Sequence, residues 1–183
     1  MSHLKGKKVA ILATHGFEQS ELAEPQKALK DAGAEVHVVS PESGKIKGWN
    51  KSDWGDQFTV DRKLSDVKSD DYDALVLPGG VMNPDLLRRD ESVLEFVQGF
   101  FKSDKPVSAI CHGPWTLIDA GVARSRKLTS YHSIKTDLKN AGANWVDEEV
   151  VVDGNLITSR KPDDLPKFCE KTIDAIAETV NTR

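Results

Sequence analysis

The sequence contains little cysteine, few aromatic residues and no long apolar run. Only two cysteines, Cys111 and Cys169, occur among 183 residues. That number is too small for a disulfide framework or a cysteine-based zinc site. Aromatic residues make up 7% of the chain, so a core must consist mainly of Val, Leu, Ile and Ala. Apolar runs such as residues 9–13 are far too short to span a bilayer.

An excess of positive charge is also absent. The chain has 25 Lys and Arg against 29 Asp and Glu, a net charge of -4. Because nucleic acids and anionic membranes both require a basic face, we expect neither as the main partner. The first residues are basic but lack the apolar stretch of a signal peptide. Together with the low cysteine count, this predicts a cytoplasmic protein.

Short apolar runs alternate with longer helical patterns, which is typical of βαβ units. We expect strands at residues 9–13, 36–39, 74–77, 107–110 and near 128, and helices at residues 18–32, 91–102, 114–120, 134–141 and 163–180. Pro25 predicts a kink or a late restart inside the first helix. Residues 41–60 predict a small hairpin excursion, and Asp-Gly-Asn at 153–155 predicts a hairpin between strands 150–152 and 156–158. The pattern indicates one α/β domain over residues 1–183, with a mostly parallel sheet.

Polar and glycine-rich segments follow three of the expected strands. The first strand is followed by THGFE at 14–18, the strand at 74–77 by PGG at 78–80, and the strand at 107–110 by CHG at 111–113. Ligands of open parallel sheets bind outside the carboxyl ends of the strands. We therefore expect a carboxylate, a thiol, an imidazole and two glycine-rich turns around one crevice.

Cys111 lies where a strand changes directly into a helix. This placement resembles a nucleophile elbow, with Gly113 at the second glycine position and Ala109 at the first. A helix N-terminus favours the thiolate, whereas most free cysteines are small buried apolar residues. We interpret Cys111 as reactive. Cys169 lies on the apolar stripe of the last expected helix, and we interpret it as a packing residue.

The candidate residues near Cys111 can be interpreted either as structural or as functional. His112 either acts as a base towards Cys111 or has a structural role. Glu18 by itself fits an ordinary acidic residue in the first turn of a helix. Gly79 and Gly80 either form a tight turn or offer backbone N–H groups to an oxyanion.

No cofactor and no metal site are expected. The glycine-rich segments do not form a phosphate loop or a dinucleotide-binding fingerprint. The remaining histidines have no spacing typical of metal ligands; they include His15, His37 and His132.

Several motifs in order resemble the ThiJ/PfpI family, most closely its intracellular-protease and general-stress-protein branch. They are ALVLPGG at 74–80, AICHGP at 109–114, TSY at 129–131, VVDGN at 151–155 and TSR at 158–160. The similarity runs from about Lys7 to Val180. It implies a flavodoxin-like, class I glutamine-amidotransferase-like sandwich that forms a homodimer or an assembly of dimers.

The resemblance also implies roles for individual residues. Cys111 matches the nucleophilic, easily oxidised cysteine of the family, and Glu18 matches the acid that hydrogen-bonds it. His112 matches the histidine after the cysteine in the protease branch. A third acid comes from the neighbouring subunit in that branch, and here it is Asp85 rather than Glu. An oxyanion would lie near the backbone N–H groups of Gly79, Gly80 and His112.

Charge repulsion constrains the expected pair of Glu18 and Cys111. An ionised Glu18 would raise the pKa of the thiol and suppress the nucleophile. The pair works if Glu18 stays protonated and donates a hydrogen bond to the thiolate, so we predict a raised pKa for this acid. The same hydrogen bond would stabilise a sulfinic acid on Cys111.

Three functions remain open at this point. The first is a stress-response enzyme that acts on reactive carbonyls such as methylglyoxal, or on early glycation adducts, resembling the glyoxalase and deglycase activities of the family. The second is an intracellular cysteine peptidase that uses Cys111, His112 and the partner's Asp85. The third is a redox sensor or stress chaperone without true turnover.

Overall fold

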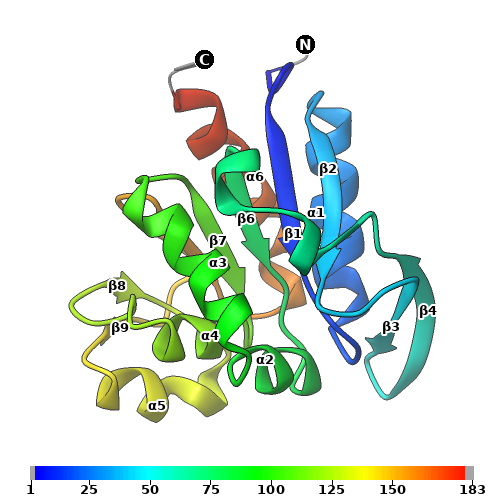
Figure 1. The fold of residues 1–183 in the computed structure, drawn as a ribbon. Coiled ribbons are helices and arrows are strands. Elements are labelled where there is room, and N and C mark those ends of the chain that lie inside the picture. The colour runs from blue at the N-terminus through cyan, green and yellow to red at the C-terminus, as the bar shows by residue number, and fades with distance from the viewer. Residues whose placement is uncertain (1–2, 180–183) are drawn as a thin grey trace.

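A seven-stranded sheet forms the centre of the computed structural model, which describes residues 3–179. Its strands are β1 (Lys8–Leu12), β2 (Glu35–Ser40), β5 (Arg62–Lys63), β6 (Ala74–Leu77), β7 (Val107–Ile110), β10 (Val150–Asp153) and β11 (Leu156–Ser159). They lie in the order β10-β11-β7-β6-β1-β2-β5, and every pair is parallel except β10 with β11 (Figure 1). Two small sheets pair β3 (Lys45–Asn50) with β4 (Asp53–Thr59), and β8 (Lys127–Leu128) with β9 (Asn144–Trp145).

Helices cover both faces of the central sheet. The α-helices are α1 (Gln19–Asp31), α2 (Met82–Leu87), α3 (Glu91–Lys102), α4 (Pro114–Asp119), α5 (Lys135–Asn140) and α6 (Leu165–Glu178). Short 3-10 helices are η1 (Leu64–Asp66), η2 (Ser69–Asp71), η3 (His132–Ile134) and η4 (Pro162–Asp164). In Figure 1, α1 and α6 lie behind the sheet and α3 in front of it, while α2 and α4 lie below the ends of the central strands. The arrangement is an α/β sandwich of the flavodoxin-like kind.

The side chains of β1 alternate between two apolar layers. Ala10 and Leu12 pack into the layer that contains Phe100 of α3. Val9 and Ile11 pack into the opposite layer, beneath α1 and α6. Burial on both faces explains why the parallel strands appear in the sequence as continuous apolar runs.

The expected elements are confirmed apart from the details below, and the structure adds the short strands β5 and β9. The hairpins at 45–59 and 150–159 both form. Helix α1 runs without interruption from Gln19 to Asp31 and buries Pro25 inside it, so of the two predicted alternatives the late restart is wrong. Helix α2 was not expected, because six residues that include Pro84 carry no helical periodicity. Val180, the expected end of the last helix, lies outside the described residues.

The strand order places a candidate crevice between β1 and β6. From β1 the chain continues to β2 on one side, whereas β6, β7 and β11 lie on the other side. Ligands of open α/β sheets bind at such a switch point, beyond the carboxyl ends of the strands. Within residues 3–179, no helix is both long and apolar enough to cross a membrane.

Candidate functional site

Cys111 occupies a strained turn between β7 and α4. Its φ angle is +63°, in the left-handed region that costs about 1–2 kcal/mol for a residue with a Cβ. Two distant segments hold this conformation. The Cys111 N–H donates to the carbonyl of Ser159 at 3.1 Å, and the Cys111 carbonyl accepts from the N–H of Tyr131 at 2.9 Å. The elbow expected from the sequence is therefore present.

Glycines leave the space that this turn requires. A Cβ on Gly79 would lie 2.7 Å from the Cβ of Cys111 and 2.6 Å from Oε1 of Glu21. A Cβ on Gly113 would lie 2.6 Å from the carbonyl oxygen of Leu77. Because real Cβ atoms do not approach so closely, glycine is required at both positions. The glycine-rich motifs thus serve close backbone approach around the thiol.

Glu21 of α1 supplies the buried acid of the site. Its side chain has 0% exposure, and Oε1 accepts the backbone N–H of Gly79 at 3.0 Å. The second oxygen, Oε2, is buried without a well-formed hydrogen bond among the described residues. Burial first, and the negative charge of Glu18 second, raise the pKa of Glu21 to about 8. At neutral pH the carboxyl therefore keeps its proton and can donate it in a hydrogen bond.

The Cys111 sulfur lies beside this carboxyl. Burial raises the pKa of the thiol, and negative charge on Glu21 raises it further. The N–H groups of Gly80 and His112 act in the opposite direction, because both donate hydrogen bonds to the sulfur. One negative charge shared by the pair can lie on either group. On sulfur it meets the protonated carboxyl and two N–H groups, which is the arrangement that a nucleophile needs.

The structure corrects the role assigned to Glu18. Glu18 precedes the first turn of α1 in an extended conformation, and its Oε1 accepts the N–H of Lys51 at 3.2 Å. Its carboxyl therefore faces the β3–β4 hairpin. Glu21, one turn further along, faces the sheet and reaches the thiol. The acid beside the cysteine is Glu21, and the raised pKa expected for that acid is found there.

The role expected for Gly79 also changes. Its N–H is taken up by Glu21 rather than offered to an oxyanion. The N–H groups of Gly80 and His112 are the ones that face the sulfur.

His112 turns its ring towards the sulfur of Cys111. Nδ1 lies 3.2 Å from the Cys111 sulfur, and Nε2 lies 3.3 Å from Oγ of Ser133. The ring stacks on Tyr131, with centroids 4.9 Å apart and an interplanar angle of 26°. Burial first, and the nearby His132 second, lower the pKa of His112. At neutral pH the imidazole is uncharged and able to accept a proton.

A cavity of about 690 Å³ opens above the thiol. Its lining comes from the strand ends, α2 and the hairpin: Gly16, Glu18, Glu21, Trp49, Lys51, Gly80, Val81, Met82, Asp85, Cys111, His112, Tyr131 and Pro162. Backbone hydrogen bonds attach the hairpin to the segment after β1, from Gly16 N–H to the Lys47 carbonyl at 2.9 Å and from Trp49 N–H to the Phe17 carbonyl at 2.7 Å. The hairpin is therefore a fixed wall of the cavity.

Asp85 lies at the rim of this cavity. It is exposed in the first turn of α2. Within residues 3–179, its carboxyl makes no hydrogen bond to His112 of the same chain. The structure thus brings Cys111, His112 and Glu21 into contact, with Glu18 and Asp85 further out.

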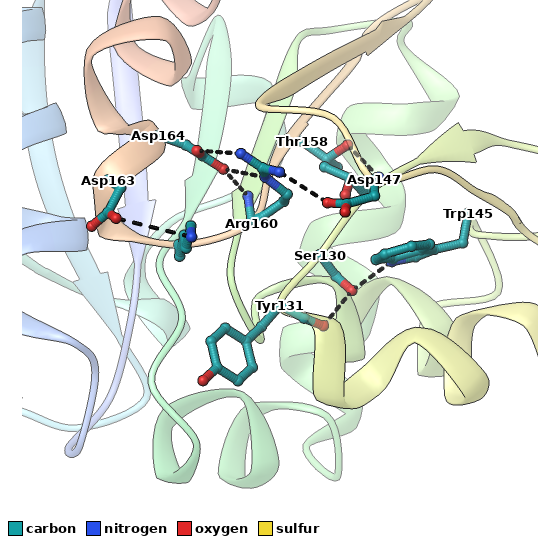
Figure 2. Close-up of polar contacts among 10 residues, drawn as sticks. Ser130, Tyr131, Trp145, Asp147, Thr158, Arg160, Asp163 and Asp164 are labelled. Carbon is teal, nitrogen blue, oxygen red and sulfur yellow. Dashed lines mark hydrogen bonds and ion pairs between the residues drawn. The ribbon is translucent and has the colours of Figure 1, made fainter.

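An ion-pair network supports the segments that hold the elbow. Arg160 donates through Nε and Nη2 to the buried Asp164 at 3.0 Å each, and through Nη1 to the exposed Asp147 at 2.9 Å (Figure 2). Trp145 donates to Oγ of Ser130 at 2.9 Å. Figure 2 shows the Tyr131 ring directed away from this network. The TSY and TSR motifs therefore position the backbone on both sides of Cys111.

The second cysteine, Cys169, lies in packed surroundings. Cys169 is half-buried against the core of α6, and burial raises its pKa to about 12. Within the described part of the chain, no group of three or more His, Cys, Asp or Glu side chains is arranged to hold a metal ion.

Three residues near the site were not expected from the sequence, namely Glu21, Asn83 and Ser133. Glu21 shares an inward helical face with Leu22, Pro25 and Leu29, and an acid on such a face is a usable signal. Asn83, with 0% exposure, accepts from Thr14 N–H at 2.8 Å and donates to the carbonyls of Pro78 and Gly79 at 3.0 and 3.1 Å. Neither Asn83 nor Ser133 has a local pattern that identifies its role.

Known proteins resemble this chain over most of its length. General stress protein 18 of Bacillus subtilis is 48% identical over 170 residues, which cover 92% of this chain and 96% of that protein. Protein/nucleic acid deglycase 2 of Escherichia coli is 47% identical over 163 residues, 88% of this chain and 93% of that protein. A Bacillus subtilis relative named provisionally as a cysteine protease, YraA, is 44% identical over 171 residues, 93% and 98% of the two chains.

The similarity extends to solved structures. Drosophila melanogaster DJ-1beta superimposes with a TM-score of 0.86 at 31% identity, over 94% of this chain and 91% of that one. The profile of the DJ-1/PfpI family matches residues 7–175. This chain belongs to the DJ-1/PfpI family.

Proposed function

We propose that this protein is a cytoplasmic stress-response enzyme that acts on reactive carbonyls or early glycation adducts through Cys111. The observation that carries the proposal is the buried pair of Glu21 and Cys111. The pKa of Glu21, raised to about 8, leaves a proton beside the sulfur at neutral pH. An acid that can donate and then accept a proton next to a nucleophile suits addition to a carbonyl group.

The chemistry with methylglyoxal balances without an external oxidant. The Cys111 sulfur adds to the aldehyde carbon, and the carbonyl oxygen takes a proton to give a hemithioacetal. A proton then moves from that carbon to the adjacent keto carbon through Glu21 or His112, which oxidises the first carbon to a thioester and reduces the second to an alcohol. Water cleaves the thioester and releases lactate and the thiol. From a methylglyoxal adduct of an amine, the same overall reaction with water releases the free amine and lactate.

The surroundings of the sulfur support this reaction class. The cavity of about 690 Å³ has largely apolar walls, including Trp49, Met82 and Tyr131, with the thiol at its base. Apolar walls exclude water and strengthen the hydrogen bonds that act on a developing charge. Relatives named as deglycases and as a general stress protein agree with the proposal.

The test follows methylglyoxal consumption together with lactate release. Cys111→Ala should abolish both, and Glu21→Gln should reduce the rate by about 100-fold or more because proton transfer is lost. Cys169→Ala is the matched control and should retain activity. Preformed adducts of methylglyoxal with N-acetylarginine and with a guanine nucleotide test the adduct class, because one relative is named for both protein and nucleic acid. Lactate release that survives Cys111→Ala would refute the proposal.

A cysteine peptidase is the second candidate, since Nδ1 of His112 lies 3.2 Å from the Cys111 sulfur. The active peptidase would be a homodimer in which Asp85 of one protomer approaches His112 of the other. Peptide cleavage that requires both Cys111 and Asp85 would favour this function. Mixing Cys111→Ala and Asp85→Asn protomers should then restore part of the activity, because one of the two sites in each mixed dimer is complete.

A redox-sensing role is the remaining alternative. The protonated Glu21 beside the sulfur would donate a hydrogen bond to a sulfinic acid formed on Cys111. Protection of cells against carbonyl stress that persists without lactate release or peptide cleavage would favour this role.

A further inference from the structure

A continuous line of polar contacts extends from the nucleophile to the protein surface. The Cys111 sulfur contacts Nδ1 of His112 at 3.2 Å, and Nε2 of the same ring contacts Oγ of Ser133 at 3.3 Å. Ser133 is the exposed central residue of the 3-10 helix η3. The ring faces of Tyr131 and Trp115 enclose the imidazole between these two polar contacts.

We propose that Ser133 is a positioning residue that holds His112 with its proton on Nε2 and the lone pair of Nδ1 directed at the thiol. The exposed hydroxyl donates to solvent and keeps a lone pair for the Nε2–H. The proton of the Cys111 thiol then moves to Nδ1 as the sulfur attacks, so that no free thiolate has to accumulate. The assignment rests on the proposed function, because it concerns the same nucleophile.

The stacked rings make this hydroxyl the group that fixes the orientation of the imidazole. Tyr131 lies parallel to the ring at 26°, and Trp115 meets it edge-on at 71°, with centroids 5.1 Å apart. Trp115 is fixed in turn by a hydrogen bond from Nε1 to Asp137 at 2.8 Å. Aromatic contacts define the plane of the imidazole, but they do not distinguish its two tautomers. A hydrogen-bond partner at Nε2 does distinguish them.

A hydroxyl in this place gives a weaker base than a carboxylate would. A carboxylate at Nε2 stabilises the imidazolium and raises the pKa of the histidine, whereas a neutral hydroxyl adds no charge. The charged and titratable groups around His112 are His132, Asp137 and Cys111 with its partner Glu21, and across the cavity Glu18, Lys51 and Asp85. Of the causes that shift the pKa of His112, the negative charge of Asp137 raises it, and burial outweighs that charge.

The base strength of His112 distinguishes between the candidate reactions. Addition of sulfur to an aldehyde needs removal of the thiol proton and returns a proton to oxygen. Hydrolysis of a peptide also requires the imidazolium to persist until it protonates the leaving amine, and a neutral hydroxyl does not stabilise that cation. The Ser133 contact therefore favours reactive carbonyl substrates over peptides.

Thiol reactivity tests the assignment without any enzyme substrate. The rate of alkylation of Cys111 by iodoacetamide is measured from pH 5 to 9 for the wild type, Ser133→Ala, Ser133→Thr and Ser133→Asp, all in a Cys169→Ala background. Ser65→Ala is the matched control, because Ser65 is also the exposed central residue of a three-residue 3-10 helix, η1. Long-range proton–nitrogen NMR spectra report the tautomer of His112 in the same variants.

We expect Ser133→Ala to lower the alkylation rate at pH 7 about fivefold and to shift His112 away from the Nε2–H tautomer. Ser133→Thr should restore both properties, since it keeps the hydroxyl. Ser133→Asp should raise the pKa of His112 by about one pH unit and move the acidic limb of the alkylation profile upward by the same amount. Ser65→Ala should match the wild type.

An unchanged tautomer and an unchanged pH profile in Ser133→Ala would overturn the assignment. So would a loss that Ser133→Thr fails to restore, because the effect would then come from packing. Failure of the proposed function is a separate result: it appears as missing lactate release in the wild type, whereas the alkylation rate and the NMR spectra remain measurable.

Discussion

Glu21→Gln should change the pH dependence of stability in a direction that follows from the burial of this carboxyl. The glutamine keeps the shape of the protonated acid, still accepts the Gly79 N–H, and does not titrate. In the folded protein the pKa of Glu21 rises from 4.5 to about 8. Between these pH values the native state holds a proton that the unfolded chain has lost. The free energy of unfolding of the wild type must therefore fall as pH rises through this window.

The size of the effect follows from the same two values. Each pH unit inside the window costs about 1.4 kcal/mol, so the full loss is about 5 kcal/mol, of which about 3 kcal/mol has occurred by pH 7. Urea denaturation at pH 5, 6, 7 and 8 gives the free energy of unfolding of both proteins. The difference in favour of Glu21→Gln should increase by about 1.4 kcal/mol per pH unit.

Two controls isolate the carboxyl. Glu24→Gln, on the exposed face of the same helix, should give a curve parallel to the wild type. The second control repeats the urea denaturation of both proteins in a Cys111→Ser background. This change removes the thiol, whose titration is coupled to that of Glu21. If the wild type and Glu21→Gln stay parallel from pH 5 to 8 in both backgrounds, Glu21 is not a buried neutral acid, and the reasoning about the thiolate is wrong.

Three further changes test the geometry around the thiol by urea denaturation. Gly79→Ala should destabilise the protein by about 1–3 kcal/mol and abolish activity, because the new Cβ would lie 2.7 Å from that of Cys111. Cys111→Gly should be more stable than Cys111→Ala by about 1 kcal/mol, because glycine accepts a φ of +63° without strain; equal stabilities would contradict the strain. Asp164→Asn should cost about 2 kcal/mol, because Asp164 is buried and accepts two side-chain hydrogen bonds from Arg160, whereas Asp147→Asn should leave the transition unchanged.

The fold and the strained turn at Cys111 could be predicted from the sequence because both depend on local patterns. Continuous apolar runs predicted the parallel strands, and a cysteine directly after one of them predicted the elbow at Cys111. Parallel strands must end at the same edge of the sheet, which brought Gly79, Gly80 and His112 to the same place. These steps need only the periodicity of the chain and the geometry of a parallel sheet.

The acid beside the thiol was assigned to Glu18 from the family resemblance, whereas the carboxyl that faces the sheet depends on where the helix begins. Glu18 and Glu21 both follow β1, and the boundary of α1 decides which one faces the sheet. A start at Gln19 turns Glu21 inward with Leu22 and Pro25, and leaves Glu18 beside the hairpin. Helix boundaries are the least certain part of a sequence pattern. Ser133 could not be foreseen either, because its contact with His112 joins residues 21 positions apart through a loop.

The attachment of the β3–β4 hairpin separates two tasks within the site. Cys111 follows β7 and Glu21 lies on α1, whereas Trp49 and Lys51 line the cavity from the β3–β4 hairpin. Changes at the hairpin tip can therefore alter which molecules enter while leaving the thiol and its proton donor intact. If the proposed function holds, the residues of this hairpin would set the range of carbonyl compounds that reach Cys111.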